Sequence, residues 1–350
     1  MIWIFVVLLI AVTLVLQHRA AGRAAIYIRA DHKPETNLAE PGEGFDLILT
    51  VGNAGRMWLP FVRLREKLPP EILPQDLSAA EKEPLGGHSV SFTAWLAPGK
   101  QQTFRLPVRI EQRGRYLLPP MMVAAGDFLG IEEEEHPYPL FREVVIPPKE
   151  APETAVNQVL GGFLGDVSVR RYLYEDPVLI AGFHEYSGHE PMRSISWSRS
   201  LRSNSLMVKN YDHTAESSVT VLLDVAECTD ALLERCCSLT RTVCRLLEDA
   251  GTEYSFASNA ELAGNFTREA SLASGLGQRH FSALLECLGR ATGRSAKTCE
   301  ALFVQAVDGQ TARGCILITS NAATADLLAL RRWKGAGNTL LVLTGEEAQT

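Results

Sequence analysis

The chain has no cysteine in its first 227 residues, and all seven of its cysteines lie at or after Cys228. An odd number of cysteines confined to one end of the chain is a poor framework for disulfides and favours a reducing compartment. Cys236, Cys237 and Cys244 show no Cys-x-x-Cys spacing and have no histidine nearby, which argues against a zinc site. We therefore interpret these three as small buried residues of a helix.

The chain also lacks an excess of cations. Its 34 Lys and Arg are outnumbered by 41 Asp and Glu, so the formal net charge is −7. Binding to duplex nucleic acid depends on neutralising phosphates with Lys and Arg, so nucleic acid is not an expected partner. At 350 residues the chain is longer than one average domain of about 100 to 200 residues, so we predict two domains.

Charged residues are absent from the first apolar run, Ile2 to Leu16, whose only polar residue is Thr13. As a helix this run falls short of the roughly 30 Å hydrocarbon core, so spanning a bilayer needs snorkelling by Arg19 or local thinning. We predict a transmembrane anchor over residues 1–18, which contacts the lipid bilayer through residues 2–16. Because cations follow the run, a single-pass protein of the cell membrane with cytoplasmic domains is expected. A cleaved signal peptide is the alternative, although no Lys or Arg precedes the run.

Motifs of nucleophilic or phosphate-binding enzymes are missing as well. There is no Gly-x-Ser-x-Gly elbow, GGFLGD (161–166) lacks a Gly-Lys-Ser/Thr ending, and ATGRSAKT (291–298) has alanines where a Walker loop needs glycines. His184 and His189 flank two glutamates, which allows a metal or acid–base pair. A surface loop with capping carboxylates is the preferred interpretation, because no third ligand is evident. We predict no catalytic residues, no metal and no cofactor.

Residues 26–148 show no sustained helical period. Short alternating or apolar runs recur instead, with Pro and Gly between them, as in GFDLILTVGN (44–53) and SVSFTAWLAP (89–98). This spacing predicts an antiparallel β-sandwich. Residues 149–180 change character and show no regular period, and we interpret residues 149–216 as a linker followed by a signature segment.

From residue 217 onward, strand and helix patterns alternate. SSVTVLLDV (217–225) is a continuous apolar run, typical of a parallel strand buried on both faces. Thr229 can cap a helix over residues 230–250, and Gly251 can end it. We predict an α/β domain with a mostly parallel sheet over residues 217–350.

Asp224 ends the first of these strands, at the edge where open α/β sheets bind ligands. This strand end is similar to the first metal-site loop of von Willebrand factor A domains, in which a carboxylate and hydroxyls bind a divalent ion. Ala226 and Cys228 stand where that loop has serines, and Ser320 stands where a later acidic residue is common. We therefore expect a von Willebrand factor A-like fold with Asp224 as a degenerate metal-site position.

A basic strip without Asp or Glu covers residues 191–210 and includes Lys209. In one interpretation, Ile195 and Trp197 are buried anchors and the arginines stay solvated. In the other, the arginines form a docking face for carboxylates of a partner, because Arg and Trp are favoured at interface hot spots. The candidate partner-binding residues are Glu185, Tyr186, Arg193, Trp197, Arg199 and Arg202.

The same segment resembles the signature of the domain of unknown function 58 family. The resemblance rests on Gly182, Glu185, Tyr186, Gly188, Pro191, Ile195, Trp197, Ser200, Arg202, Leu206 to Lys209 and Tyr211, with RGRYLLPPMMVAAGDFLGI (113–131) and VVIPP (144–148) upstream. The chain departs from the family at His184, where Arg is usual, at His189, where Asp is usual, and at Ser194 and Ser196. These departures leave open whether the family's activity is shared.

The resemblance implies a bacterial membrane system whose members are commonly encoded beside MoxR-type AAA+ ATPases. We therefore expect a non-enzymatic, membrane-anchored interaction or scaffold protein that partners such an ATPase in the assembly or maturation of a membrane or envelope complex. The alternative is an exported cell-envelope protein whose β-sandwich binds glycan or protein. The sequence does not identify the client or the oligomeric state.

Overall fold

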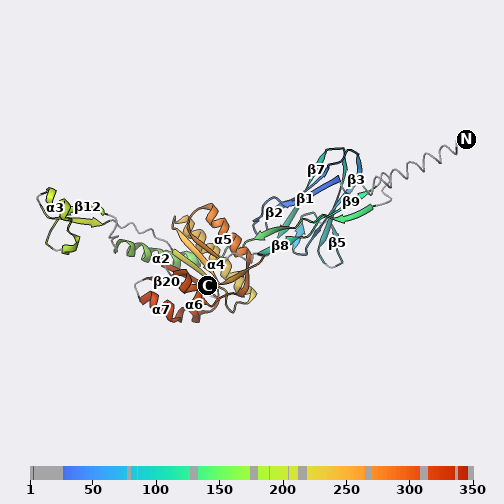
Figure 1. The fold of residues 1–350 in the computed structure, drawn as a ribbon. Coiled ribbons are helices and arrows are strands. Elements are labelled where there is room, and N and C mark those ends of the chain that lie inside the picture. Colours follow the sequence, from blue (N-terminus) through green and yellow to red (C-terminus); the bar gives the residue numbers. More distant parts are fainter. Residues whose placement is uncertain are drawn as a thin grey trace. The chain divides into compact units, whose positions relative to one another are not determined.

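The structure is a computed structural model of the chain. It describes residues 3, 27–76, 80–84, 86–126, 133–173, 180–188, 190–203, 205–211, 219–264, 270–307, 314–335 and 338–345. The chain divides into two compact units, unit 1 (Met1–Lys149) and unit 2 (Glu150–Thr350) (Figure 1). Each unit has a hydrophobic core of its own.

Unit 1 is a β-sandwich. Its strands are β1 (Ile28–Pro34), β2 (Gly44–Asn53), β3 (Leu59–Leu68), β4 (Ile72–Pro74), β5 (Ala80–Lys82), β6 (His88–Leu96), β7 (Gln101–Ile110), β8 (Gly114–Leu118), β9 (Met122–Gly126), β10 (Glu133–Pro137) and β11 (Arg142–Ile146). One sheet has the order β1-β2-β7-β4, the other β10-β9-β3-β6-β5, and β11 pairs with β8. Each of these pairs is antiparallel.

The alternation of side chains along the strands builds the core of the sandwich. Leu47 and Leu49 of β2 and Val62 and Leu64 of β3 are all buried, and the residues between them are more exposed. Because successive side chains of a strand point to opposite faces, each sheet places one apolar face toward the other.

A polar pair interrupts this apolar core. His32 of β1 and Glu66 of β3 belong to different sheets and are 2% and 0% exposed, with His32 Nδ1 2.9 Å from Glu66 Oε1. Burial alone lowers the pKa of His32, but the hydrogen bond to Glu66 and the charge of its carboxylate overcome burial, so this pKa lies above 6.5. Burial raises the pKa of Glu66 above 4.5. Both groups therefore hold their protons more tightly in the folded chain.

The stability of unit 1 is expected to fall as pH rises. The stabilising contribution of His32 is complete below pH 6.5 and is lost as the pH rises through the raised pKa of His32. The stabilising contribution of Glu66 falls in the same direction, above pH 4.5. Urea unfolding between about pH 5 and about pH 8, followed by the fluorescence of Trp58 and Trp95, measures this slope. The His32→Leu/Glu66→Leu double variant should lose it. A midpoint that rises with pH in the wild type would contradict the prediction.

Unit 2 contains a five-stranded mixed sheet, six α-helices and two 3-10 helices within its described residues. Its strands are β12 (Ile180–Glu185), β13 (Met207–Tyr211), β14 (Val219–Asp224), β15 (Tyr254–Ser258), β16 (Ala260–Leu262), β17 (Ser271–Gly275), β18 (Ala291–Ser295), β19 (Gly314–Thr319) and β20 (Thr339–Thr344). Its α-helices are α2 (Glu153–Leu173), α3 (Trp197–Ser203), α4 (Asp230–Asp249), α5 (Gln278–Arg290), α6 (Cys299–Val307) and α7 (Leu328–Gly335), and its 3-10 helices are η1 (Met192–Ser194) and η2 (Ala322–Asp326).

The sheet has the order β17-β15-β14-β19-β20, and β12-β13 and β16-β18 form separate two-stranded sheets. Within the larger sheet β14-β15, β14-β19 and β19-β20 are parallel, and β15-β17 is antiparallel. Val221 and Leu223 of β14 point into the core shared with α2, α4 and α5, and Leu222 points into the core shared with α6 and α7. Helices therefore cover both faces of this sheet.

Helix α2 was not predicted, because residues 149–180 were interpreted as a linker and lead-in without a regular period. Val156, Leu160 and Phe163 are 4%, 2% and 5% exposed and join the core that contains β14. This i, i+4, i+7 stripe is a helical signal, but the nearby glycines lower the helix propensity of the segment. Tertiary packing, more than local preference, explains this helix.

The expected fold class is wrong. Five of the six sheets in the described residues are wholly antiparallel and the sixth is mixed, so the chain is mostly antiparallel β. The sandwich of unit 1 is present, but three of the six strand pairs described in unit 2 are antiparallel, so unit 2 is not the mostly parallel α/β domain that was expected. The expectation of a von Willebrand factor A-like domain is therefore not supported either. In unit 2 the sequence pattern indicated the strands that are joined by helices, but not the antiparallel pairs β12-β13, β15-β17 and β16-β18, whose strands are near neighbours in sequence.

The expected membrane helix is a further correction. Across the described residues, no helix has the length and apolar character needed to cross a membrane, so a single-pass location in the cell membrane and lipid contact through residues 2–16 are not supported. Apart from Trp3, the residues of that run lie outside the part of the chain that the structure describes.

Candidate functional site

The candidate partner-binding residues lie in one small module of unit 2, residues 180–211, which we call the hairpin module. Its strands β12 and β13 pair antiparallel, and η1 and α3 lie between them in the chain. Ile195 and Val208 form an isolated antiparallel bridge and are 5% and 2% exposed. They are the buried hydrophobic residues of the module within its described part.

Two serines of the strip tie α3 to β13. Ser196 N donates to Met207 O at 2.8 Å, and Ser200 Oγ accepts from Met207 N at 2.8 Å. Ser200 Oγ also donates to Ser196 O at 2.9 Å. Short hydroxyl side chains can satisfy nearby backbone groups in this way, which explains why a module with a very small core is rich in serine.

Helix α3 buries none of its side chains. Trp197 and Leu201 are 59% and 87% exposed, and a spacing of four places them on one face. Arg199 and Arg202 are also exposed, and a spacing of three places them together on another face. The expectation that Trp197 is a buried anchor is therefore wrong, whereas the burial of Ile195 is confirmed.

The remaining candidates lie on the same module. Arg193 is exposed in η1, next to the exposed Met192. The guanidinium carbon of Arg199 lies 5.0 Å from the centroid of the Phe183 ring, a cation–π contact that orients it. Glu185 is exposed at the end of β12, and Tyr186, which follows it, is half-buried. The structure thus brings together all six residues that the sequence nominated.

Glu190 closes the turn between β12 and η1. It accepts hydrogen bonds from Ser187 N at 3.0 Å and Ser187 Oγ at 2.7 Å, and its Oε1 lies 3.2 Å from His184 Nε2. The hydroxyl of Ser187, against desolvation and with help from His184, lowers the pKa of Glu190 to about 2. These contacts describe a turn-closing carboxylate. The other histidine of the proposed pair, His189, lies outside the described residues.

Asp224 lies at the carboxyl end of β14, where it is 2% exposed. Its Oδ1 accepts from Asn259 Nδ2 at 2.6 Å and from Ala226 N at 3.1 Å. Its Oδ2 accepts from Thr319 Oγ1 at 3.0 Å, and the thiol of Cys299 is a further hydrogen-bond partner. Four protein donors therefore surround one carboxylate, and we call this arrangement the Asp224 network.

These donors leave Asp224 poorly suited to bind a metal. A carboxylate has about four lone-pair sites, and the Asp224 network uses that number. A divalent ion also needs several further oxygen ligands, whereas Ala226 and Cys228 supply none from their side chains. Among the described residues, no group of three or more His, Cys, Asp or Glu is arranged to hold a metal ion.

Two cysteines lie beside this network. The sequence indicates Cys236 as a small buried residue and Cys228 as a position that supplies no oxygen ligand, but it does not connect the two. The hydrogen bond from the Cys236 thiol lowers the pKa of Cys228 to about 7, against desolvation and with help from Ser320. The same bond and burial raise the pKa of Cys236. Ser320 Oγ donates to Ala226 O at 3.1 Å, so the loops that follow β14 and β19 meet here. No local sequence signal links these residues, because Ser320 and Cys228 are far apart in the chain.

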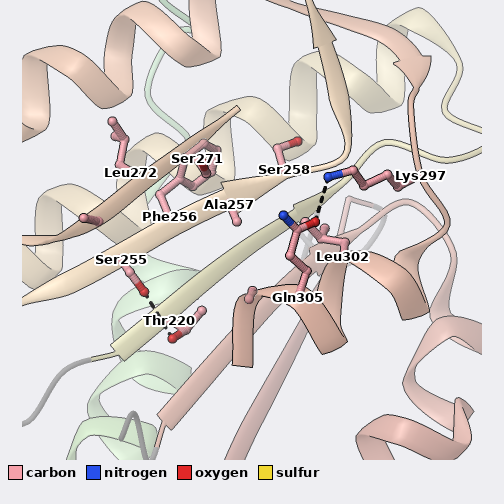
Figure 2. Close-up of a pocket in the computed structure, with 12 residues that line it drawn as sticks. Thr220, Ser255, Phe256, Ala257, Ser258, Ser271, Leu272, Lys297, Leu302 and Gln305 are labelled. Carbon is pink, nitrogen blue, oxygen red and sulfur yellow. Dashed lines mark hydrogen bonds between the residues drawn. The ribbon is translucent and has the colours of Figure 1, made fainter. Parts of the chain in front are cut away.

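A cavity of about 300 Å³ lies on the α6 side of the sheet (Figure 2). Hydroxyl groups from three strands line it, namely those of Thr220, Ser255, Ser258 and Ser271. Ser255 Oγ donates to Thr220 Oγ1 at 3.2 Å, and Lys297 Nζ donates to Gln305 Oε1 at 2.7 Å. Figure 2 shows both bonded pairs, with Ala257 between them in this view.

Comparison with known proteins gives no family for this chain. No protein-family model matches it. No curated protein sequence matches it either.

Several solved structures show limited similarity. The CARDB domain of a Pyrococcus furiosus protein in complex with di-metal ions is 12% identical, with a TM-score of 0.23, over 34% of this chain and 86% of its own. A cohesin module from a Clostridium perfringens family 33 glycoside hydrolase is 16% identical, with a TM-score of 0.25, over 34% and 96%. A type II cohesin domain from the cellulosome of Acetivibrio cellulolyticus is 12% identical, with a TM-score of 0.27, over 34% and 94%. At these scores no property of these proteins is transferred to this chain.

Proposed function

We propose that the chain is a non-catalytic interaction protein that uses the hairpin module to bind an acidic surface of a partner protein. The observation that carries this proposal is α3, a helix that buries none of its own side chains. A helix normally gains much of its stability by packing an apolar face, and this one leaves Trp197 and Leu201 in solvent. Such an exposed pair is suited to packing against a second protein.

The charge of the module supports an acidic partner. Arg193, Arg199 and Arg202 are all exposed, and the strip that carries them contains no Asp or Glu between Pro191 and Asn210. Arg and Trp are enriched at the energetic centres of interfaces, where Arg forms forked hydrogen bonds with carboxylates. Two hydrogen bonds, from Met207 N to Ser200 Oγ and from Ser196 N to Met207 O, hold α3 on β13, which reduces the ordering that binding requires.

The resemblance to the domain of unknown function 58 family supports a specific partner within this proposal, a MoxR-type AAA+ ATPase. In this role the chain is a scaffold that presents the ATPase to a complex under assembly or maturation. The residues that carry the resemblance include Trp197 and Arg202, which are among the exposed residues of α3.

Replacing Arg193, Arg199 and Arg202 together by Ser is expected to weaken partner binding at least about tenfold and to leave folding intact, because all three are exposed. In-cell crosslinking of the tagged chain, followed by mass spectrometry, identifies the partner and maps its contacts. Binding of the purified partner to each variant is then measured by titration. Crosslinks from the hairpin module to acidic segments of an AAA+ ATPase are the expected result.

A matched control replaces three other exposed cations of unit 2, Arg294, Arg332 and Lys334, by Ser. This change removes the same charge and should leave binding unchanged. A Trp197→Ser/Leu201→Ser variant tests the apolar face independently of charge. Equal affinity of the wild type and the arginine variant would refute the docking role.

A second candidate function belongs to unit 1. Trp58 and Trp95 are 52% and 59% exposed, and their rings lie 4.6 Å apart, centroid to centroid. Asn53, which is 3% exposed, donates to Met57 O at 2.7 Å and fixes the loop that carries Trp58. An exposed tryptophan pair, with Trp58 on a fixed loop and Trp95 on β6, favours binding of glycan or protein by the sandwich. Crosslinks confined to this loop in the same experiment would support this candidate over the first.

A further inference from the structure

The cavity on the α6 side of the sheet lies against β15, whose face on this side carries small side chains. Ser255 and Ala257 of β15 point to this face, whereas Tyr254 and Phe256 point into the opposite core. Helix α6 packs its buried Leu302, Phe303 and Ala306 beside this face. The strands beside α6 therefore keep an open space of about 300 Å³, at the lower end of the usual range for ligand pockets.

The lining of the cavity carries positive charge and no negative charge. Lys297 is its cation, and none of the twelve residues that line it is Asp or Glu. Thr220 and Ser255, which we call the floor of the cavity, are 1% and 4% exposed, and their hydroxyl groups are hydrogen-bonded to each other. Each hydroxyl can both donate and accept hydrogen bonds, so this floor matches a ligand that also carries hydroxyl groups. Leu302 and Ala306 supply an apolar wall.

We propose that this cavity binds a small hydroxylated organic anion, with its anionic group at Lys297 and its hydroxyl groups on the floor of Thr220 and Ser255. The ammonium group of Lys297 forms a charge-assisted hydrogen bond with the anion and gives up part of its bond to Gln305. The anionic group belongs to a phosphate monoester or to a carboxylate, since both satisfy an ammonium donor.

Binding at this site is connected to the Asp224 network. The amide nitrogen of Asn259 that donates to Asp224 also donates to the backbone oxygen of Lys297, at 3.1 Å. Ala296 N donates to Asn259 O at 2.8 Å. A ligand that engages Lys297 therefore acts on a segment held by the same asparagine as Asp224, and binding is expected to stabilise unit 2 against unfolding.

Equilibrium dialysis of the full chain against three labelled probes tests the proposal. Glycerol 3-phosphate and glycerate carry the two candidate anions on the same short polyol stem, and glycerol carries no charge. The expected result is saturable binding of one molecule per chain for one or both anions, with glycerol at least about tenfold weaker. The two anions separate a phosphate site from a carboxylate site.

Three variants separate the charge of Lys297 from the space of the cavity. Lys297→Gln should weaken anion binding about tenfold or more, and Lys334→Gln, an exposed lysine of the same unit, should leave it unchanged. Ala273→Leu fills the cavity from an exposed position on β17 without altering charge, and it should abolish binding. Absence of saturable binding, equal binding of glycerol, or unchanged binding to Lys297→Gln would each overturn the proposal.

Discussion

Replacing Glu66 by Ala is expected to lower the free energy of unfolding of unit 1 by about 3–5 kcal/mol. The Glu66 carboxylate is 0% exposed and lies 2.9 Å from His32 Nδ1, so its removal leaves a buried imidazole without that partner. The change also opens a cavity between the two sheets of the sandwich. Urea unfolding followed by the fluorescence of Trp58 and Trp95 measures the loss.

The His32→Leu/Glu66→Leu double variant is the control, and it is expected to be as stable as the wild type within about 1 kcal/mol, or more stable. Glu66 Oε2 has no hydrogen-bond partner among the described residues, so the pair is only partly satisfied in its apolar surroundings. Replacing both partners removes this desolvation cost. A Glu66→Ala variant that unfolds at the urea concentration of the wild type would show that the buried His32 imidazole does not depend on Glu66 as a partner.

Elements defined by local signals could be predicted from the sequence. The apolar stripe after Thr229 and the glycine at 251 predicted a helix over residues 230–250, and α4 spans Asp230–Asp249. The side chain of Thr229 accepts a hydrogen bond from Leu232 N, as expected of a helix cap. The strand expected over residues 44–53 is β2, Gly44–Asn53. Helix caps and hydrophobic periodicity depend on residues that are close in sequence, so both can be recognised from the sequence.

The pairing of strands could not be predicted in the same way. Strand β17 joins the larger sheet antiparallel to β15, and the hairpin β12-β13 encloses η1 and α3. Neither pairing follows from the composition of its strands, because a short strand can pair with several others at similar energy. The fold class was therefore misread although many of its elements were found.

The candidate functional residues show the same difference between local signals and contacts of distant residues. The hairpin module is continuous in sequence, so its six candidate residues could be nominated together. The exposure of Trp197 could not be predicted, since Ile195, and not Trp197, fills the small core of the module. The donors of the Asp224 network come from Asn259 and Thr319, 35 and 95 residues further along the chain. No spacing rule connects positions so far apart.

Replacing Asp224 by Ala is expected to lower the free energy of unfolding of unit 2 by about 3 kcal/mol. The change leaves the donors of Asn259, Ala226 and Thr319 without their shared acceptor in a site where Asp224 is 2% exposed. A buried donor without a partner carries its full desolvation cost, so the loss exceeds that of an exposed hydrogen bond. Urea unfolding followed by the fluorescence of Trp197 and Trp333, the tryptophans of this unit, measures it.

Asp224→Asn and added divalent ions separate this structural role from a role as a metal ligand. Asn keeps the shape of the side chain and one carbonyl acceptor, so it is expected to cost only about 1 kcal/mol. Millimolar Mg²⁺ or Ca²⁺ should leave the thermal midpoint of the wild type unchanged, because protein donors already occupy the carboxylate. If either ion instead raises the midpoint of the wild type but not that of Asp224→Asn, the carboxylate exchanges its internal donors for the ion. The Asp224 network is then a metal site in its closed state, and the loops after β14 and β19 are the parts that must open.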